Sequence, residues 1–166
     1  AYTGGASVAA SAAGAAVCHV DAAKGMVSWA KENAALSGLK DRTIRYIVDD
    51  VKKFTEREVR RGNKYDGIVM DPPSYGRGPG GELWKIEQEL FDLIKLCMSV
   101  LSDKPLFFLT NTYTTGLSGS VMENIFRLTL LEKFGGSFEV DEVGLPITNL
   151  KLRLPCGYSS RWCASD

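Results

Sequence analysis

The run from Asp71 to Tyr75, with the sequence DPPSY, directly follows a short apolar stretch that is typical of a strand. Its two prolines fix the backbone and cannot donate hydrogen bonds, so the Asp71 carboxylate and nearby carbonyl groups remain available as acceptors. Acceptors at a strand end suit an amino or amide group that must be oriented for reaction, and Tyr75 can stack on a flat substrate. The alternative is a plain proline-bounded turn. The candidate catalytic residues are Asp71, Pro72, Pro73, Ser74 and Tyr75.

A glycine-rich turn at the start of the sequence precedes a helix that we expect to begin near Ala6. Glycines permit a tight turn from strand to helix and let a ligand approach the backbone. The free amides at the helix start favour a negative group such as a carboxylate. An ordinary strand-to-helix turn is the alternative. The candidate binding residues in this turn are Tyr2, Thr3, Gly4 and Gly5.

Acidic residues follow the next two candidate strands. Asp21 lies after the glycine turn at the distance typical of a carboxylate that accepts hydrogen bonds from ribose hydroxyls. Asp49 and Asp50 end the following strand, where a carboxylate can accept a hydrogen bond from an adenine amino group. Capping of a helix N-terminus is the alternative for all three aspartates.

The elements that position these residues alternate between short apolar runs and longer segments with helical spacing, which predicts an α/β fold with a mostly parallel sheet. The candidate strands are Ala16 to Val20, Thr43 to Val48, Gly67 to Met70, Leu106 to Thr110, Phe138 to Leu145 and Leu150 to Leu154. The candidate helices are Ala6 to Ala13, Ala23 to Leu36, Val51 to Arg61, Leu83 to Leu101 and Ser120 to Phe134.

The last two candidate strands are separated only by Pro146 to Asn149, which is too short for a parallel crossover and predicts an antiparallel hairpin at the sheet edge. We therefore expect a doubly wound, Rossmann-like sheet that ends in a reversed strand. The glycine turn of such a fold normally follows the central strand. Almost nothing precedes it here, so we expect that first strand to be missing and the sequence to be a fragment of a longer chain.

The composition excludes several classes of protein. The chain has 166 residues, 45% of them hydrophobic and 24% charged, which fits one folded domain over residues 1–166. Lysine and arginine total 20, as do aspartate and glutamate, so any RNA-binding surface must be local. No run is long enough to span a membrane. With four cysteines outside any CxxC motif and one histidine, we expect a cytoplasmic protein without a metal site.

These motifs together resemble the class I S-adenosylmethionine-dependent methyltransferases. More narrowly, AYTGGAS, HVDAAKGMVSWAKENAALSGL, IVDDV and DPPSYGRG resemble the branch of bacterial 23S ribosomal RNA cytosine-C5 methyltransferase-like proteins. The resemblance covers nearly the whole chain. It implies S-adenosyl-L-methionine as cofactor and RNA as partner. Tyr2 to Gly5 would line the methionine part, Asp21 the ribose, Asp50 the adenine with Asp49 beside it, and Asp71 to Tyr75 the methyl-transfer face.

One position departs from this branch. Its members have a cysteine nucleophile after the strand that corresponds to Leu106 to Thr110, whereas this sequence reads Thr110-Asn111-Thr112-Tyr113-Thr114 there. Cys97 falls in a candidate helix, and we expect Cys156 and Cys163 to lie beyond the last strand. The acceptor-rich segment therefore suits methylation of a heteroatom, such as an exocyclic nitrogen or an amide.

Two other functions remain open from the sequence. A NAD-type nucleotide-cofactor oxidoreductase shares the glycine turn and Asp21, although it explains neither Asp71-Pro72-Pro73 nor the reversed strand. A non-catalytic module that binds the cofactor is the second.

The basic residues between Lys52 and Lys64 are interleaved with Glu56 and Glu58, which favours a solvated helix face over a phosphate-binding one. The sequence leaves the oligomeric state open, and the loop from Gly76 to Gly81 is interpreted as a lid over substrate.

Overall fold

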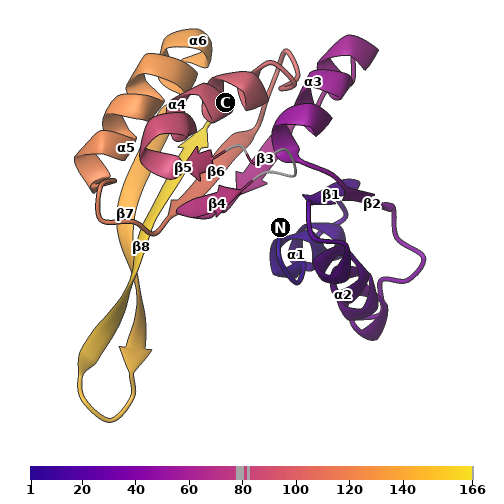
Figure 1. Cartoon of the computed structure of the whole chain (residues 1–166), viewed down its shortest axis with the longest axis horizontal. Coiled ribbons are helices and arrows are strands. Elements are labelled where there is room, and N and C mark those ends of the chain that lie inside the picture. Colours follow the sequence, from indigo (N-terminus) through magenta and orange to yellow (C-terminus); the bar gives the residue numbers. More distant parts are fainter. Residues whose placement is uncertain (78–80, 82, 166) are drawn as a thin grey trace. The chain divides into compact units, whose positions relative to one another are not determined.

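The computed structural model describes residues 1–77, 81 and 83–165. The chain forms two compact units, residues 1–60 and residues 61–166, each of which has its own packing (Figure 1). The expectation of one domain that belongs to a longer chain stays a prediction. No helix among the described residues is long and apolar enough to cross a lipid bilayer.

The first unit is a parallel pair of strands flanked by helices. Its elements are α1 (Gly5–Ala12), β1 (Val17–Asp21), α2 (Lys24–Leu36), β2 (Ile44–Val48) and α3 (Val51–Arg61). β1 and β2 run parallel in a register that pairs Asp21 with Val48. The two strands therefore end side by side, and their carboxyl ends bring the acidic residues of both strands to one edge.

A narrow core joins the helices of the first unit to its strands. Val27, Ala30 and Ala34 recur at helical spacing on α2, and all three are buried. Ser7 of α1 hydrogen-bonds Nδ1 of the buried His19 on β1 at 2.9 Å. This hydrogen bond fixes α1 against the strand in which the candidate ribose-binding residue lies.

The second unit contains the remaining strands and helices. Its elements are β3 (Gly67–Met70), β4 (Tyr75–Arg77), β5 (Leu83–Lys85), α4 (Ile86–Met98), β6 (Phe107–Thr112), α5 (Gly119–Phe126), the π-helical turn η1 (Arg127–Leu131), α6 (Glu132–Phe134), β7 (Ser137–Ile147) and β8 (Leu152–Cys163). β4 and β5 form a separate antiparallel hairpin. This hairpin leads directly from the DPPSY segment into α4.

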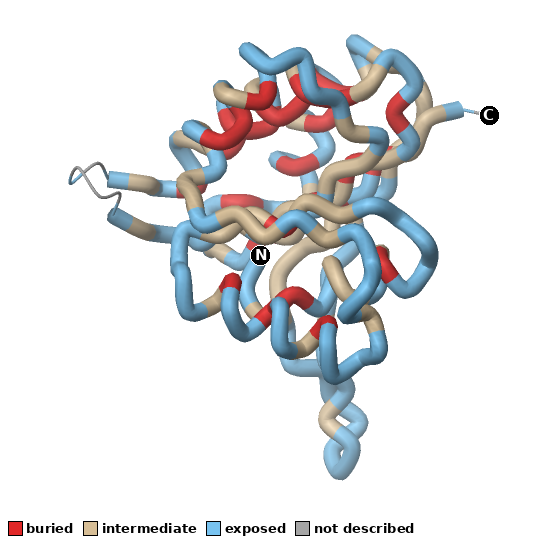
Figure 2. The backbone as a smooth tube through the Cα atoms, turned by 90° about the vertical axis from the view of Figure 1, so that its right-hand side faces the viewer, coloured by how far each residue is buried: buried red, intermediate tan, exposed pale blue. Residues whose placement is uncertain are grey.

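The core of the second unit lies between its helices and one face of its sheet (Figure 2). α4 buries Leu90, Leu93 and Ile94 at helical spacing. Phe108 of β6 and Trp162 of β8 are fully buried against the helices. Because strand side chains alternate between faces, the neighbouring residues of β6 and β8 point to the opposite face.

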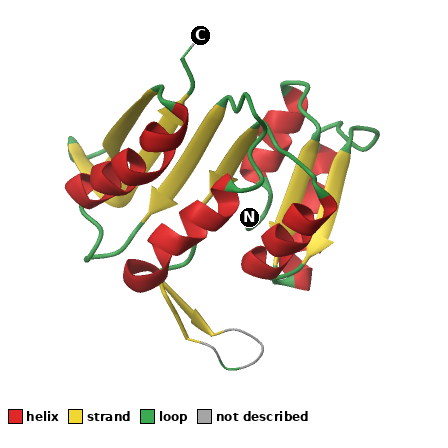
Figure 3. Ribbon diagram, turned by 90° about the horizontal axis from the view of Figure 1, so that it is seen from above, coloured by secondary structure: helices red, strands yellow, loops and turns green. Residues whose placement is uncertain are grey.

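The sheet of the second unit has the strand order β3-β6-β8-β7 (Figure 3). β3 and β6 run parallel, whereas β8 is antiparallel to both β6 and β7. The expected α/β fold with a reversed terminal strand is therefore confirmed. The strand order also places β8 inside the sheet, between two strands that precede it in the chain.

Several expected boundaries are corrected. The stretch Leu83–Lys85 is a strand, so α4 begins at Ile86 instead of at Leu83. The expected helix from Ser120 to Phe134 contains a π-helical turn. β8 continues through Cys163, so Cys156 and Cys163 lie within the last strand and not beyond it. In the interpreted lid, residues 78–80 lie outside the described part of the chain.

Beyond the sheet, β7 and β8 continue as a two-stranded ribbon (Figure 1). Pro146 lies within β7, whereas the sequence predicted it in the connecting turn. The register shifts from Glu142 opposite Tyr158 to Gly144 opposite Pro155, so the extra residue lies in β8. Gly157 at this bulge has a φ of 88°. A bulge of this kind bends a strand, which lets β8 serve both the sheet and the ribbon.

Candidate functional site

The glycine turn is held closely against α2. Gly4 has a φ of 86°, and a Cβ atom at this position would lie 2.8 Å from Cβ of Ala30. The side-chain amide of Asn33 donates to the Thr3 carbonyl at 2.9 Å. A Cβ on Gly5, in contrast, would meet no atom within 4 Å. The turn is thus fixed on its α2 side and open at Gly5, where the first amides of α1 lack partners within the helix.

The Asp21 carboxylate organises the backbone around it. Oδ2 accepts hydrogen bonds from the Ala1 amino group at 2.8 Å and the Tyr2 amide at 2.9 Å. Oδ1 accepts one from the Ala23 amide at 2.9 Å. Burial alone would raise the pKa of Asp21, but these donors, the Ala1 amino group first, outweigh burial and lower the pKa. Asp21 is therefore a carboxylate at neutral pH.

The second pair of aspartates lies beside Asp21. The Asp49 amide donates to the Asp21 carbonyl at 3.1 Å, so the ends of β1 and β2 are joined. The Asp49 carboxylate forms an ion pair with Arg57 of α3. Oδ1 of Asp50 accepts from the Lys53 amide at 3.1 Å and thereby caps α3. The structure brings these aspartates together with the glycine turn, and helix capping also occurs at Asp50.

The DPPSY segment lies in the second unit, directly after β3. Its backbone is held by its neighbours: the Trp84 indole donates to the Pro73 carbonyl at 2.6 Å, and the Ile86 amide donates to the Ser74 carbonyl at 3.1 Å. The Ser74 hydroxyl donates to the Tyr113 carbonyl at 2.5 Å. These bonds connect the segment to the β4–β5 hairpin, to α4 and to the end of β6.

The two side chains with expected chemical roles in this segment stay accessible. Asp71 is exposed and makes no hydrogen bond or ion pair with any described residue. Tyr75 is 55% exposed. A rigid backbone that presents an unpartnered carboxylate and an open aromatic ring is suited to orient a flat group that carries an N–H donor.

Three supporting residues escaped the sequence analysis. Asn33 lies in the middle of α2, and nothing in its local sequence indicates that it reaches the glycine turn. Trp84 falls within the range Leu83 to Leu101, which the apolar spacing predicts as a helix. Tyr113 contributes only its backbone carbonyl. All three act through long-range hydrogen bonds, which single-sequence periodicity does not reveal.

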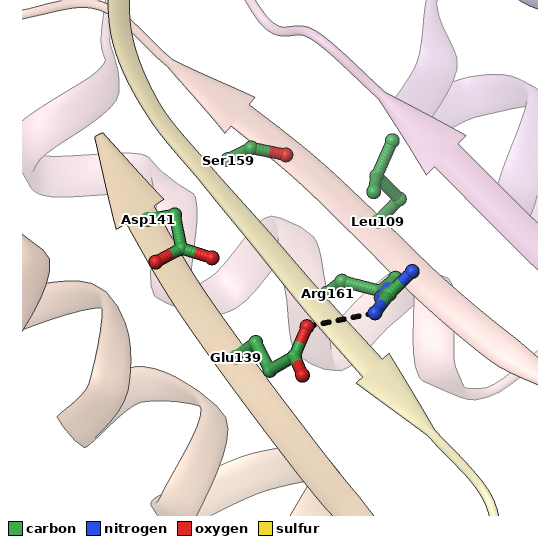
Figure 4. Close-up of a pocket in the computed structure, with 5 residues that line it drawn as sticks. All are labelled: Leu109, Glu139, Asp141, Ser159 and Arg161. Carbon is green, nitrogen blue, oxygen red and sulfur yellow. Dashed lines mark hydrogen bonds and ion pairs between the residues drawn. The ribbon is translucent and has the colours of Figure 1, made fainter. Parts of the chain in front are cut away.

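A shallow pocket of about 260 Å³ lies elsewhere, on the sheet face opposite the helices of the second unit (Figure 4). It is lined by Leu109, Glu139, Asp141, Ser159 and Arg161. The Arg161 guanidinium donates to Glu139 at 2.7 Å across neighbouring strands. The pocket contains none of the residues expected to be catalytic, and no group of three potential metal ligands occurs among the described residues.

Curated proteins similar to this chain include several named as ribosomal RNA methyltransferases. No family model matches it. "Ribosomal RNA large subunit methyltransferase K/L" of Methylococcus capsulatus is 33% identical over 144 residues, which are 81% of this chain and 19% of that protein. "Ribosomal RNA large subunit methyltransferase K" of Neisseria meningitidis is 31% identical over 125 residues, 74% of this chain and 35% of that one.

The solved structures include a similar protein as well. The crystal structure of the SAM-dependent methyltransferase from Agrobacterium tumefaciens is 39% identical and superimposes with a TM-score of 0.90, covering 99% of this chain and 54% of that one. This chain thus spans about half of the solved relative, about a fifth of the Methylococcus protein and about a third of the Neisseria protein. The chain belongs to the class I S-adenosylmethionine-dependent methyltransferases and is related to members of that class named for ribosomal RNA.

Proposed function

We propose that this chain binds S-adenosylmethionine and transfers its methyl group to a heteroatom of an RNA base. The observation that carries the proposal is the exposed, unpartnered Asp71 carboxylate at the end of β3, on a backbone held by Trp84 and Tyr113. The names of the relatives in Methylococcus and Neisseria support RNA as the substrate.

The first unit offers groups that fit the cofactor. The open backbone at Gly5 suits its carboxylate, which free amides can bind. Asp21 accepts three hydrogen bonds, and since a carboxylate offers about four acceptor positions, it can take a further one from a ribose hydroxyl. The second oxygen of Asp50 makes no hydrogen bond with the described residues and suits the adenine amino group. Asp49 would act through its position beside Asp50.

Asp71 would orient the acceptor and remove its proton. When bound, the cofactor would supply a methyl group on a sulfonium, from which the neutral thioether S-adenosylhomocysteine leaves readily, so alignment of the acceptor would contribute most of the rate. The Asp71 carboxylate accepts a hydrogen bond from the N–H of the acceptor and takes that proton as the new N–C bond forms. Tyr75 stacks on the base and fixes its plane.

A heteroatom fits this site better than a ring carbon. Addition to cytosine requires a thiolate close to the base, and the segment after β6 offers Tyr113 and Thr114 instead of cysteine. Cys97 is buried in α4, where it has no access to a substrate. We therefore propose an exocyclic nitrogen or an amide-type nitrogen as the acceptor.

Calorimetric titration with S-adenosylhomocysteine and with NAD tests the cofactor. We expect micromolar binding of the first and none of the second, with affinity reduced at least about tenfold in Asp21→Ala. Asp41→Ala removes an exposed carboxylate from the same unit and is the matched control. Binding of NAD in place of S-adenosylhomocysteine would contradict the proposed cofactor. Binding of S-adenosylhomocysteine without methyl transfer to unmodified ribosomal RNA would support a non-catalytic module.

A further inference from the structure

Asn111 lies near the end of β6, beside the DPPSY segment. Met70, the last residue of β3, pairs with the residue directly before Asn111. Further along both segments, the Ser74 hydroxyl donates to the Tyr113 carbonyl at 2.5 Å. Asn111 lies between these two contacts on β6, and Asp71 lies between them on the other segment. Since neighbouring strands are about 5 Å apart, the backbone of Asn111 lies close to that of Asp71.

The Asn111 side chain points to the sheet face opposite the helices, which we call the open face. Asn111 pairs with Ser159 of β8, and side chains of paired residues in an antiparallel ladder lie on the same face. Ser159 lines the pocket on the open face, as does Leu109, two residues before Asn111 (Figure 4). Thr110, whose side chain points to the other face, is fully buried. The Asn111 amide therefore lies on the accessible side of the sheet.

The side-chain amide of Asn111 is not used within the fold. Asn111 is half-buried, and its side chain makes no hydrogen bond with any described residue. An amide that has lost part of its water without gaining a partner costs free energy, which a ligand with matching groups recovers. Asn33 differs, because its amide donates to the Thr3 carbonyl and thereby holds the glycine turn. The Asn111 amide can thus offer both a donor and an acceptor to a ligand.

We propose that Asn111 contacts the substrate base and fixes its rotation within the plane of the ring. A hydrogen bond to Asp71 and stacking on Tyr75 would leave the base free to turn about that one bond. A second hydrogen bond, to the ring nitrogen next to the reacting amino group, removes this freedom and aligns the amino nitrogen with the methyl group. The Asn111 amide donates to a ring lone pair or accepts from a ring N–H. This inference rests on the proposed function.

Asp71 and Asn111 together select a class of base. Adenine, cytosine and guanine each carry an amino group next to a ring nitrogen, whereas uracil carries none and is excluded. A base that is bound at this edge and stacked on Tyr75 cannot at the same time stay stacked and paired in a duplex. The arrangement therefore fits an amino-bearing base that is unpaired or flipped out of its helix.

Methyl transfer to unmodified ribosomal RNA by Asn111→Leu tests this role. Leucine has nearly the same size but lacks the amide, so kcat should fall by about tenfold, because a misaligned acceptor reacts slowly. The affinity for the RNA should change by less than about twofold, since phosphate contacts contribute most of it. Asn111→Gln keeps the amide and should recover part of kcat. Asn124→Leu, at an exposed position on α5, is the matched control.

The outcomes separate this inference from the proposed function. A wild-type chain that transfers no methyl group would overturn the proposed function and this inference with it. An active wild-type chain whose Asn111→Leu variant keeps its full kcat would overturn the role of Asn111 alone. A lower kcat accompanied by a lower urea midpoint and weaker binding of S-adenosylhomocysteine would show a structural role and overturn it as well. Mass spectrometry of nucleosides from the methylated RNA should find a methylated amino group, and methylated uridine would contradict the class of base.

Discussion

The carboxyl ends of β1 and β3 both carry an aspartate, and the two aspartates differ in what surrounds them. The Asp21 carboxylate accepts three hydrogen bonds, two from the backbone amides of Tyr2 and Ala23 and one from the Ala1 amino group. The Asp71 carboxylate accepts none from the described residues. Asp21 thus organises the chain around it, whereas Asp71 is left free for a substrate. Under the proposed function, the same residue type at the end of a strand would have a binding role at Asp21 and a chemical role at Asp71.

The supporting bonds differ in the same sense. At β1 the acid itself holds the backbone in place. At β3 the backbone is held by Trp84 and by the Ile86 amide, and neither of them bonds to the Asp71 carboxylate. Substitutions should therefore separate the two regions: changes near Asp21 should affect stability and cofactor affinity together, and changes at Asp71 should affect turnover alone.

The largest effect is expected at Asp71. Replacement Asp71→Asn keeps the shape but removes the proton acceptor, so methyl transfer to ribosomal RNA should fall by about a hundredfold or more. The affinity for S-adenosylhomocysteine and the free energy of unfolding should stay unchanged. Asp103→Asn, at an exposed loop position of the same unit, is the control. Unchanged turnover would remove Asp71 from the site.

The next effect concerns the glycine turn. Gly4→Ala forces an unfavourable φ and drives Cβ against Ala30, so we expect a loss of about 2 to 4 kcal/mol in the free energy of unfolding and weaker cofactor binding. Gly38→Ala is a matched control, because Gly38 has a φ of 75° but a Cβ atom at this position would meet no atom within 4 Å. It should cost only about 1 to 2 kcal/mol. Equal losses in urea unfolding would show that packing against α2 is unimportant.

A smaller effect is expected for Trp84→Phe. Loss of the hydrogen bond to the Pro73 carbonyl, worth about 1 kcal/mol, should lower kcat roughly fivefold while cofactor affinity stays the same. Under the proposed function, Trp84 would be a positioning residue. Trp29→Phe, on α2 of the other unit, serves as control. If kcat is unaffected and only the melting temperature falls, Trp84 has a purely structural role.

The smallest effect is a pH dependence confined to the first unit. Burial lowers the pKa of His19, the Ala1 ammonium lowers it further, and Asp21 opposes both. Because the pKa of His19 is lowered in the folded chain, the folded chain takes up this proton at a lower pH than the unfolded chain, whose histidine has the ordinary pKa of 6.5. Stability should therefore decrease as pH falls through 6.5. In His19→Asn, urea unfolding between pH 7.5 and 5.5 should show a shallower decrease; an identical slope would exclude His19 as the cause.

Local sequence patterns were enough for some elements and not for others. The bounds of β3 and α3 agree with the sequence analysis, because each is a continuous apolar or amphipathic run between clear turn residues. The sequence predicts β5 as part of a helix, since Leu83 fits the spacing of the α4 stripe. β8 was ended at Leu154, although pairing with β6 extends it across the polar residues that follow.

The candidate site also combines residues that the sequence predicts with contacts that only the structure reveals. Asp21, Asp49 and Asp71 are predicted as site residues from their positions at strand ends, which chain order reveals, and their roles stay predictions. That Arg57 pairs with Asp49 and that Asn33 holds the glycine turn depends on distances between helices and loops. Such contacts are set by tertiary packing, so the sequence indicates where the site lies more readily than what supports it.

The position of β8 has a consequence for synthesis of the chain. β8 is made after β6 and β7, yet it lies between them and buries Ser160 and Trp162. Until residues up to Cys163 have left the ribosome, β6 has an open edge and the core lacks its tryptophan. The emerging chain must keep that edge from pairing with other nascent chains. Completion of this sheet therefore waits for β8 to be translated.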